Sequence, residues 1–67
     1  MPIDLGKIEV LRKRAGLTQA EVAARVGMTR QRWNDLVRGR HPGLTLKTVE
    51  RIAAALGVKV ADILLEA

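Results

Sequence analysis

The 67-residue sequence contains no cysteine, serine, tyrosine or phenylalanine, and it has only one histidine and one tryptophan. Without cysteine there is no disulfide, and a single histidine excludes a zinc site of the ordinary kind. No apolar stretch approaches the roughly 20 residues that a membrane span needs, and the N-terminus lacks the apolar region of a secretory signal. We therefore expect a cytoplasmic protein that needs no metal, no cofactor and no membrane.

The same scarcity argues against catalysis. The common nucleophiles are missing, and there is no glycine-rich phosphate loop after a strand. The acidic side chains are scattered along the chain, each near a basic residue, so no acid–base pair is indicated. We predict no enzymatic activity and no catalytic residue.

Basic charge is concentrated in the middle of the chain. The formal net charge is +5, and residues 25–47 hold six arginine and lysine side chains against Asp35 alone. The segments on either side are close to balanced. This distribution indicates a polyanion as the partner.

Apolar periodicity and stop signals predict an all-α fold. The hydrophobic content is 48% with almost no aromatic residues, so the core must consist mainly of Leu, Ile, Val and Ala. The five predicted helices span about residues 5–15, 18–26, 29–38, 45–56 and 60–66. In the fourth helix, Leu46 is expected to face inward together with Val49. The length predicts a single domain over residues 1–67, with its core at about 5–65.

The second and third helices carry the strongest local signals. Thr18 and Glu21 form a capping box, in which each side chain accepts from the backbone amide of the other residue. Gly27 is expected to end the second helix in a left-handed conformation, and Thr29 is expected to cap the third. The pattern predicts a helix, a short turn and a second helix.

The third helix has one polar face and one apolar face. The polar face carries Arg30, Gln31, Asn34, Asp35 and Arg38, and the opposite face carries Trp33, Leu36 and Val37. A short helix with an apolar back and a front of Arg, Gln and Asn suits reading base edges in a DNA major groove.

Four segments together resemble a known family. These segments are Gly16–Ala23 (GLTQAEVA), Gly27–Arg30 (GMTR), Arg38–Gly39 (RG) and Ile52–Val58 (IAAALGV). They are similar to the phage-repressor-like helix-turn-helix family, also called Cro/repressor or XRE, over roughly residues 5–65. The resemblance implies a compact five-helix lambda-repressor-like DNA-binding domain, with the helix-turn-helix at helices two and three. It also implies sequence-specific binding of double-stranded DNA, most often by a dimeric transcription repressor.

Site residues follow from the motif and the resemblance. Base contacts are expected from Arg30, Gln31, Asn34 and Asp35, because Arg pairs with guanine and Gln or Asn with adenine. For Asp35 we favour a second role, holding Arg32 or Arg38 in place at helix spacing. Phosphate contacts are expected from Thr18, Gln19, Arg38, Arg40, His41, Thr45 and Lys47. The motif core is predicted to comprise Val22, Ala23, Val26, Gly27, Trp33 and Leu36.

One position departs from the family pattern. The family commonly has Glu where this chain has Val37, paired with an arginine that matches Arg12. Arg12 must therefore point to solvent, to another carboxylate or to DNA. Trp33 also replaces the usual aliphatic residue, and its indole N–H needs a partner if it is buried.

Dimerisation and the alternatives stay open at this point. A single module covers too little DNA for tight specific binding, so we expect a homodimer through helices four and five, with Leu44, Val58 and Leu65 as apolar contacts. The segment RQRWNDLVRGR also resembles antitoxins built on this fold, which hold a toxin and regulate their own synthesis. An engineered DNA-binding module on this scaffold is a third interpretation.

Overall fold

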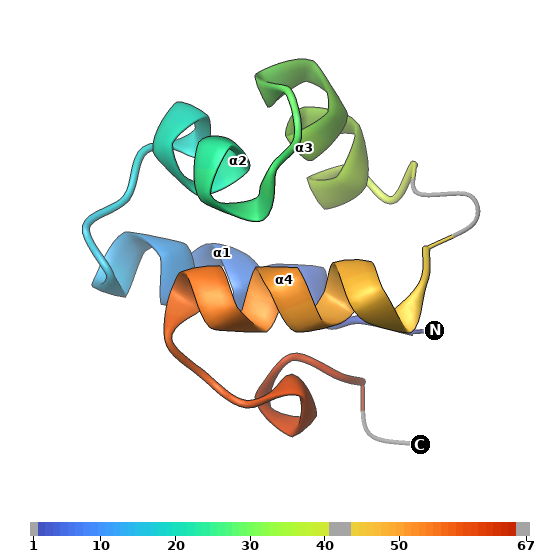
Figure 1. The fold of residues 1–67 in the computed structure, drawn as a ribbon. Coiled ribbons are helices and arrows are strands. Elements are labelled where there is room, and N and C mark those ends of the chain that lie inside the picture. Colours follow the sequence, from blue (N-terminus) through green and yellow to red (C-terminus); the bar gives the residue numbers. More distant parts are fainter. Residues whose placement is uncertain (1, 41–43, 66–67) are drawn as a thin grey trace.

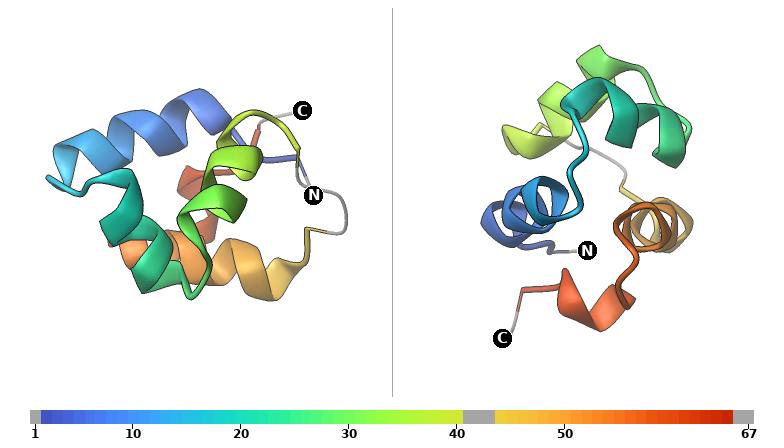
Figure 2. Two further views of the ribbon diagram at one scale, coloured as in Figure 1. Left: turned by 90° about the horizontal axis from the view of Figure 1, so that it is seen from above. Right: turned by 90° about the vertical axis from the view of Figure 1, so that its left-hand side faces the viewer.

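The computed structural model describes residues 2–40 and 44–65. These residues form four α-helices and one short 3-10 helix, namely α1 (Leu5–Arg14), α2 (Gln19–Val26), α3 (Arg30–Val37), α4 (Leu46–Leu56) and η1 (Val60–Asp62). α1 and α4 form one layer, α2 and α3 lie above it, and η1 lies beneath (Figure 1 and Figure 2). No helix among the described residues combines the length and the apolar character needed to cross a membrane.

The helix ends follow from local side-chain chemistry. Every α-helix begins after a residue whose side-chain oxygen accepts from the backbone amide three positions later, and these caps are Asp4, Thr18, Thr29 and Thr45. α2 and α4 end at Gly27 and Gly57, which have φ values of 86° and 70°. The four α-helices expected from the sequence are therefore confirmed, with small differences at their ends.

The predicted fifth helix over residues 60–66 is wrong. The chain makes only the single turn of η1 and then becomes extended, and Ile3 and Leu64 form an antiparallel bridge. The amide of Asp4 donates to the carbonyl of Ile63 at 2.8 Å. The amide of Leu65 donates to the carbonyl of Pro2 at 3.3 Å, whereas a continuing α-helix would need this amide to donate to the carbonyl of Ala61. Pairing with the N-terminal segment therefore replaces helix propagation.

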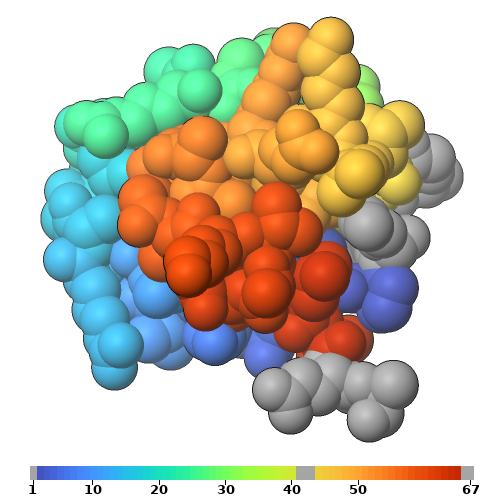
Figure 3. All heavy atoms as spheres, turned by 60° about the horizontal axis from the view of Figure 1, so that its bottom comes forward, coloured from blue at the N-terminus to red at the C-terminus, as the bar shows by residue number. Residues whose placement is uncertain are grey.

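The core is aliphatic around a single aromatic ring. The largest fully buried side chains are Trp33, Ile8, Ile52, Ile63, Val22 and Val49. α2 packs on both α3 and α4, and η1 packs on α4. The segment of η1 lies on the lower face of the molecule, beside atoms of α1 and α4 (Figure 3). Leu46 contradicts the sequence prediction, because it is 49% exposed. The buried stripe of α4 starts one turn later, at Val49.

Candidate nucleic-acid interface

The turn between α2 and α3 sets the angle between the two helices. The left-handed Gly27 donates its amide to the carbonyl of Ala23 at 3.0 Å, and the amide of Met28 donates to the same carbonyl at 2.9 Å. Thr29 then accepts from the amide of Arg32 at 3.1 Å and starts α3. These bonds tie the start of α3 to the end of α2.

The back of α3 is fully buried. Trp33 has no exposed surface, and Leu36 is 3% exposed. On the facing helix α2, Val22, Ala23 and Val26 are also buried. The small Ala23 side chain allows the two helices to pack closely, since a larger group there would push them apart. The six residues predicted as the motif core thus comprise five buried side chains and the turn glycine.

The indole N–H of Trp33 is the exception in this core. Among the described residues the indole nitrogen has no hydrogen-bond partner, although the atom is buried. No residue that the structure describes therefore supplies the partner whose need the sequence indicated. A buried donor without an acceptor destabilises the folded state, so packing of the ring must outweigh this loss.

The front of α3 faces a shallow hollow of about 240 Å³. Its lining consists of Gln19 from α2 together with Arg30, Gln31 and Asn34 from α3. Three predicted base contacts and one predicted phosphate contact are therefore brought to a single place. Each of these side chains carries hydrogen-bond donors suited to base edges or to phosphate.

Asp35 differs from our favoured interpretation. Its carboxylate accepts from the side-chain amide of Gln31 at 3.3 Å, one helical turn away. Within the described chain it forms no ion pair with Arg32 or Arg38. The Asp35 carboxylate therefore orients the side chain of Gln31, a predicted base contact, and not that of either arginine.

The start of α2 is a second anion-attracting feature. The hydroxyl of Thr18 accepts from the amide of Glu21 at 3.1 Å, and the Glu21 carboxylate accepts from the amide of Thr18 at 3.0 Å. The hydrogen bond that the Thr18 backbone amide donates to this carboxylate is the main cause that lowers the pKa of Glu21 below its ordinary value of 4.5, and the Thr18 side chain adds to the effect. Helix geometry leaves the amides of Gln19 and Ala20 without intrahelical partners, so both can bind an anion.

The remaining predicted phosphate contacts lie beyond the other end of α3. Arg38 and Arg40 are exposed after the helix, and the amide of Arg40 donates to the carbonyl of Asp35 at 2.7 Å. Thr45 and Lys47 are exposed at the start of α4. His41 lies outside the described residues. The two groups of predicted phosphate contacts are thus separated along the chain by α3.

Arg12 finds its partner within its own helix. Its guanidinium contacts the carboxylate of Glu9 at 2.8 Å and donates to the carbonyl of Leu17 at 2.7 Å. The Arg12 side chain is 11% exposed and that of Glu9 is 28% exposed. Of the three possibilities that the sequence left open, the other carboxylate is correct. The i, i+3 spacing of Glu9 and Arg12 was the signal that could have identified this pair.

Comparison with known proteins gives consistent matches. A family model described as a helix-turn-helix domain matches residues 7–65. An uncharacterized HTH-type transcriptional regulator from Methanothermobacter thermautotrophicus is 55% identical over 47 residues, which are 69% of this chain and 65% of that protein. This chain therefore matches slightly less than two thirds of its curated relative.

A solved structure has a similar fold. The crystal structure of the hypothetical transcription factor NHTF from Neisseria superimposes with a TM-score of 0.79 at 32% sequence identity. The match covers 88% of this chain and 67% of that one. The resemblance inferred from the four sequence segments is confirmed: the chain belongs to the helix-turn-helix domain family.

Proposed function

We propose that this chain binds double-stranded DNA sequence-specifically, with α3 in the major groove, and that it regulates transcription as a repressor. The hollow that brings Gln19 together with Arg30, Gln31 and Asn34 carries this proposal. Arg30 suits guanine, and Gln31 and Asn34 suit adenine, because each pair forms two parallel hydrogen bonds. Membership of the helix-turn-helix family and the regulator names of its relatives support it.

Phosphate contacts on both flanks of α3 would fix its register. Gln19 and the free amides of α2 lie on one flank, and Arg38, Arg40, Thr45 and Lys47 supply the other. Four or five neutralised phosphates give a slope of about −4 for log affinity against log salt. A much shallower slope would mean that these side chains are ordinary surface charges.

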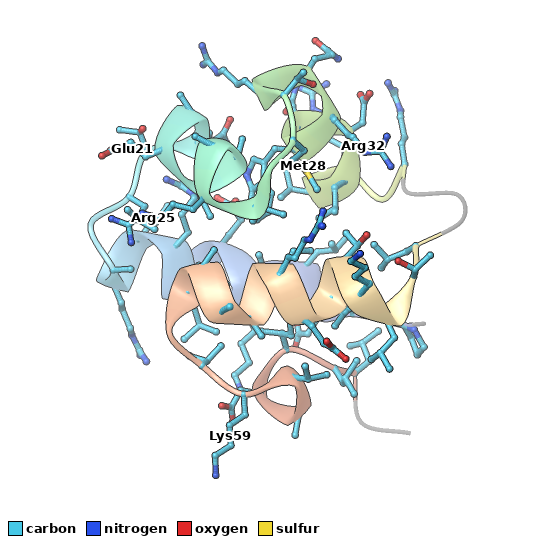
Figure 4. All side chains as sticks on the ribbon, in the orientation of Figure 1. Glu21, Arg25, Met28, Arg32 and Lys59 are labelled. Carbon is cyan, nitrogen blue, oxygen red and sulfur yellow. The ribbon has the colours of Figure 1, made fainter. Side chains whose placement is uncertain are left out.

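Selection from randomised duplex DNA at near-physiological salt is the first experiment. Sequencing of the retained duplexes should show an enriched motif. With that motif as probe, Arg30→Ala should weaken binding by about 1–3 kcal/mol and relax preference at one base pair. Lys47→Ala should weaken binding to all sequences alike. Lys59→Ala is the matched control, since Lys59 lies at the far end of the molecule (Figure 4).

The outcomes separate the possible modes of binding. If Arg30→Ala leaves sequence preference unchanged, the docking of α3 is wrong. If no motif is enriched but retention depends on salt, the basic side chains hold phosphates without reading bases. If no DNA is retained at low salt, the proposed function fails.

A homodimer is part of the proposal, with the region of α4 and the C-terminal segment as the contact. Leu65 is 51% exposed and Leu46 is 49% exposed. Leu44 and Val58, which the sequence also suggested, are instead partly buried against the core. A palindromic selected motif would support the dimer, and Leu65→Asp should then lower affinity for the palindrome more than for a single half-site.

A further inference from the structure

A second hollow lies on a different side of the helix-turn-helix. Its volume is about 470 Å³, and it is formed where the turn between α2 and α3 approaches α4. The residues that line it are Ala24, Val26, Gly27, Met28, Thr29, Arg32, Thr48 and Arg51. None of these belongs to the hollow around Gln19. Figure 4 shows Met28 between α3 and α4, with Arg32 on α3 close to it.

The lining has the chemistry of an anion site. Arg32 comes from α3 and Arg51 from α4, so two guanidinium groups on different helices flank the same hollow. The described lining includes no carboxylate, and neither arginine forms an ion pair with a residue that the structure describes. Two cations without a counter-charge at one hollow favour binding of an oxyanion, and the planar fork of arginine matches phosphate oxygens.

Two threonine hydroxyls complete the set of donors. The Thr29 oxygen accepts from the amide of Arg32 at 3.1 Å, which leaves its O–H proton available to a ligand. The Thr48 hydroxyl shares a 3.2 Å hydrogen bond with Thr45, in which either group can donate. The hollow therefore presents both charged and neutral donors.

We propose that this hollow binds a phosphate group through Arg32 and Arg51. The group is either a free phosphate in solution or a backbone phosphate of a bound duplex; the second source rests on the proposed function. Because Met28 and Thr29 lie between α2 and α3, an anion held here contacts the segment that sets the orientation of α3. Occupancy by free phosphate would then alter DNA binding from outside the base-reading hollow.

Titration of inorganic phosphate into the ¹⁵N-labelled chain without DNA tests the first source. Chloride at matched ionic strength is the reference. Saturable chemical-shift changes at the amides of Met28, Thr29 and Thr48 are expected. Arg51→Gln should lower the phosphate affinity by about tenfold, as expected for loss of a charge-assisted pair. Lys59→Gln should leave it unchanged.

Two further variants keep the result interpretable. Arg51→Lys keeps the charge but not the planar fork, so it should retain part of the affinity. Arg32→Gln should lower phosphate affinity as Arg51→Gln does, while the spectra of both variants stay dispersed. If saturable shifts persist unchanged in both glutamine variants, the assignment of the site is wrong.

DNA binding tests the second source. If the chemical-shift changes do not saturate with free phosphate, Arg51→Gln should still weaken binding to all duplex sequences equally and reduce the salt slope by about 1. The proposal is overturned if the shift changes do not saturate with phosphate and Arg51→Gln also leaves the DNA affinity and its salt dependence unchanged. Because the phosphate titration needs no DNA, its failure is distinguishable from failure of the proposed function.

Discussion

Trp33 offers the most direct test of how the recognition helix is held in place. The ring is fully buried on the back of α3, and it is the largest of the fully buried side chains. Replacement of a buried Trp or Phe by Ala destabilises a protein by about 3–5 kcal/mol. At roughly 0.05–0.15 kcal/mol per residue, a chain of this length is stable by only about 3–10 kcal/mol. Trp33→Ala should therefore remove a large part of the free energy of unfolding.

Trp33→Phe separates the contribution of packing from that of the indole N–H. The variant keeps a ring in the core but removes a donor that has no partner among the described residues. An unsatisfied buried donor destabilises the folded state by about 1–3 kcal/mol. Its removal therefore offsets much of the stability that is lost with the smaller ring. We expect Trp33→Phe to lie within about 1 kcal/mol of the parent and to bind the selected DNA motif with unchanged preference.

Urea unfolding followed by far-UV circular dichroism is the appropriate assay, because both variants lose the only tryptophan and with it the fluorescence signal. The reasoning is refuted if Trp33→Phe is as damaging as Trp33→Ala, since the indole N–H would then make a hydrogen bond that stabilises the fold. A loss below about 1 kcal/mol for Trp33→Ala would refute the assignment of Trp33 to the core.

Three other predictions concern single residues. Glu9→Gln should destabilise the fold by about 1–3 kcal/mol in thermal unfolding, because Arg12 is only 11% exposed and loses its anionic partner; an unchanged midpoint would show that Arg12 reaches water freely. Gly27→Ala should destabilise by about 1–2 kcal/mol through its φ of 86° alone, since an added Cβ meets nothing within 4 Å. The matched control is Gly6→Ala, in α1, where the added Cβ would lie 3.6 Å from the Asp4 carboxylate, an ordinary contact. It should stabilise the fold by about 0.5–1 kcal/mol, because alanine favours a helix more than glycine does. Because the pKa of Glu21 is lower in the folded than in the unfolded chain, its ionised carboxylate stabilises the fold above about pH 4.5. This stabilisation is lost as the pH falls through the pKa of the folded state. Glu21→Gln should therefore flatten the pH dependence of stability in that acidic range, and an unaltered profile would contradict this role.

Base-reading candidates could be identified from the sequence because they share one short helix. Arg30, Gln31 and Asn34 fall on one face by helical periodicity, and the structure places them at one hollow with Gln19. The preferred partner of Asp35 could not be ranked in the same way. Gln31, Arg32 and Arg38 all lie three or four residues from it, so spacing alone does not choose among them.

The sequence by itself determined the four α-helices, the threonine caps of α2, α3 and α4, and the glycine turn between α2 and α3. These features depend on hydrogen bonds and dihedral preferences within a few residues. The length of the last helix, the exposure of Leu46 and the meeting of Arg32 with Arg51 at one hollow were decided only by the tertiary structure. Each depends on a segment distant in sequence, as when the amide of Leu65 donates to the carbonyl of Pro2 and not to that of Ala61, as a longer last helix would require. Local sequence patterns do not show which distant backbone group will form a hydrogen bond with an amide that a continuing helix would use.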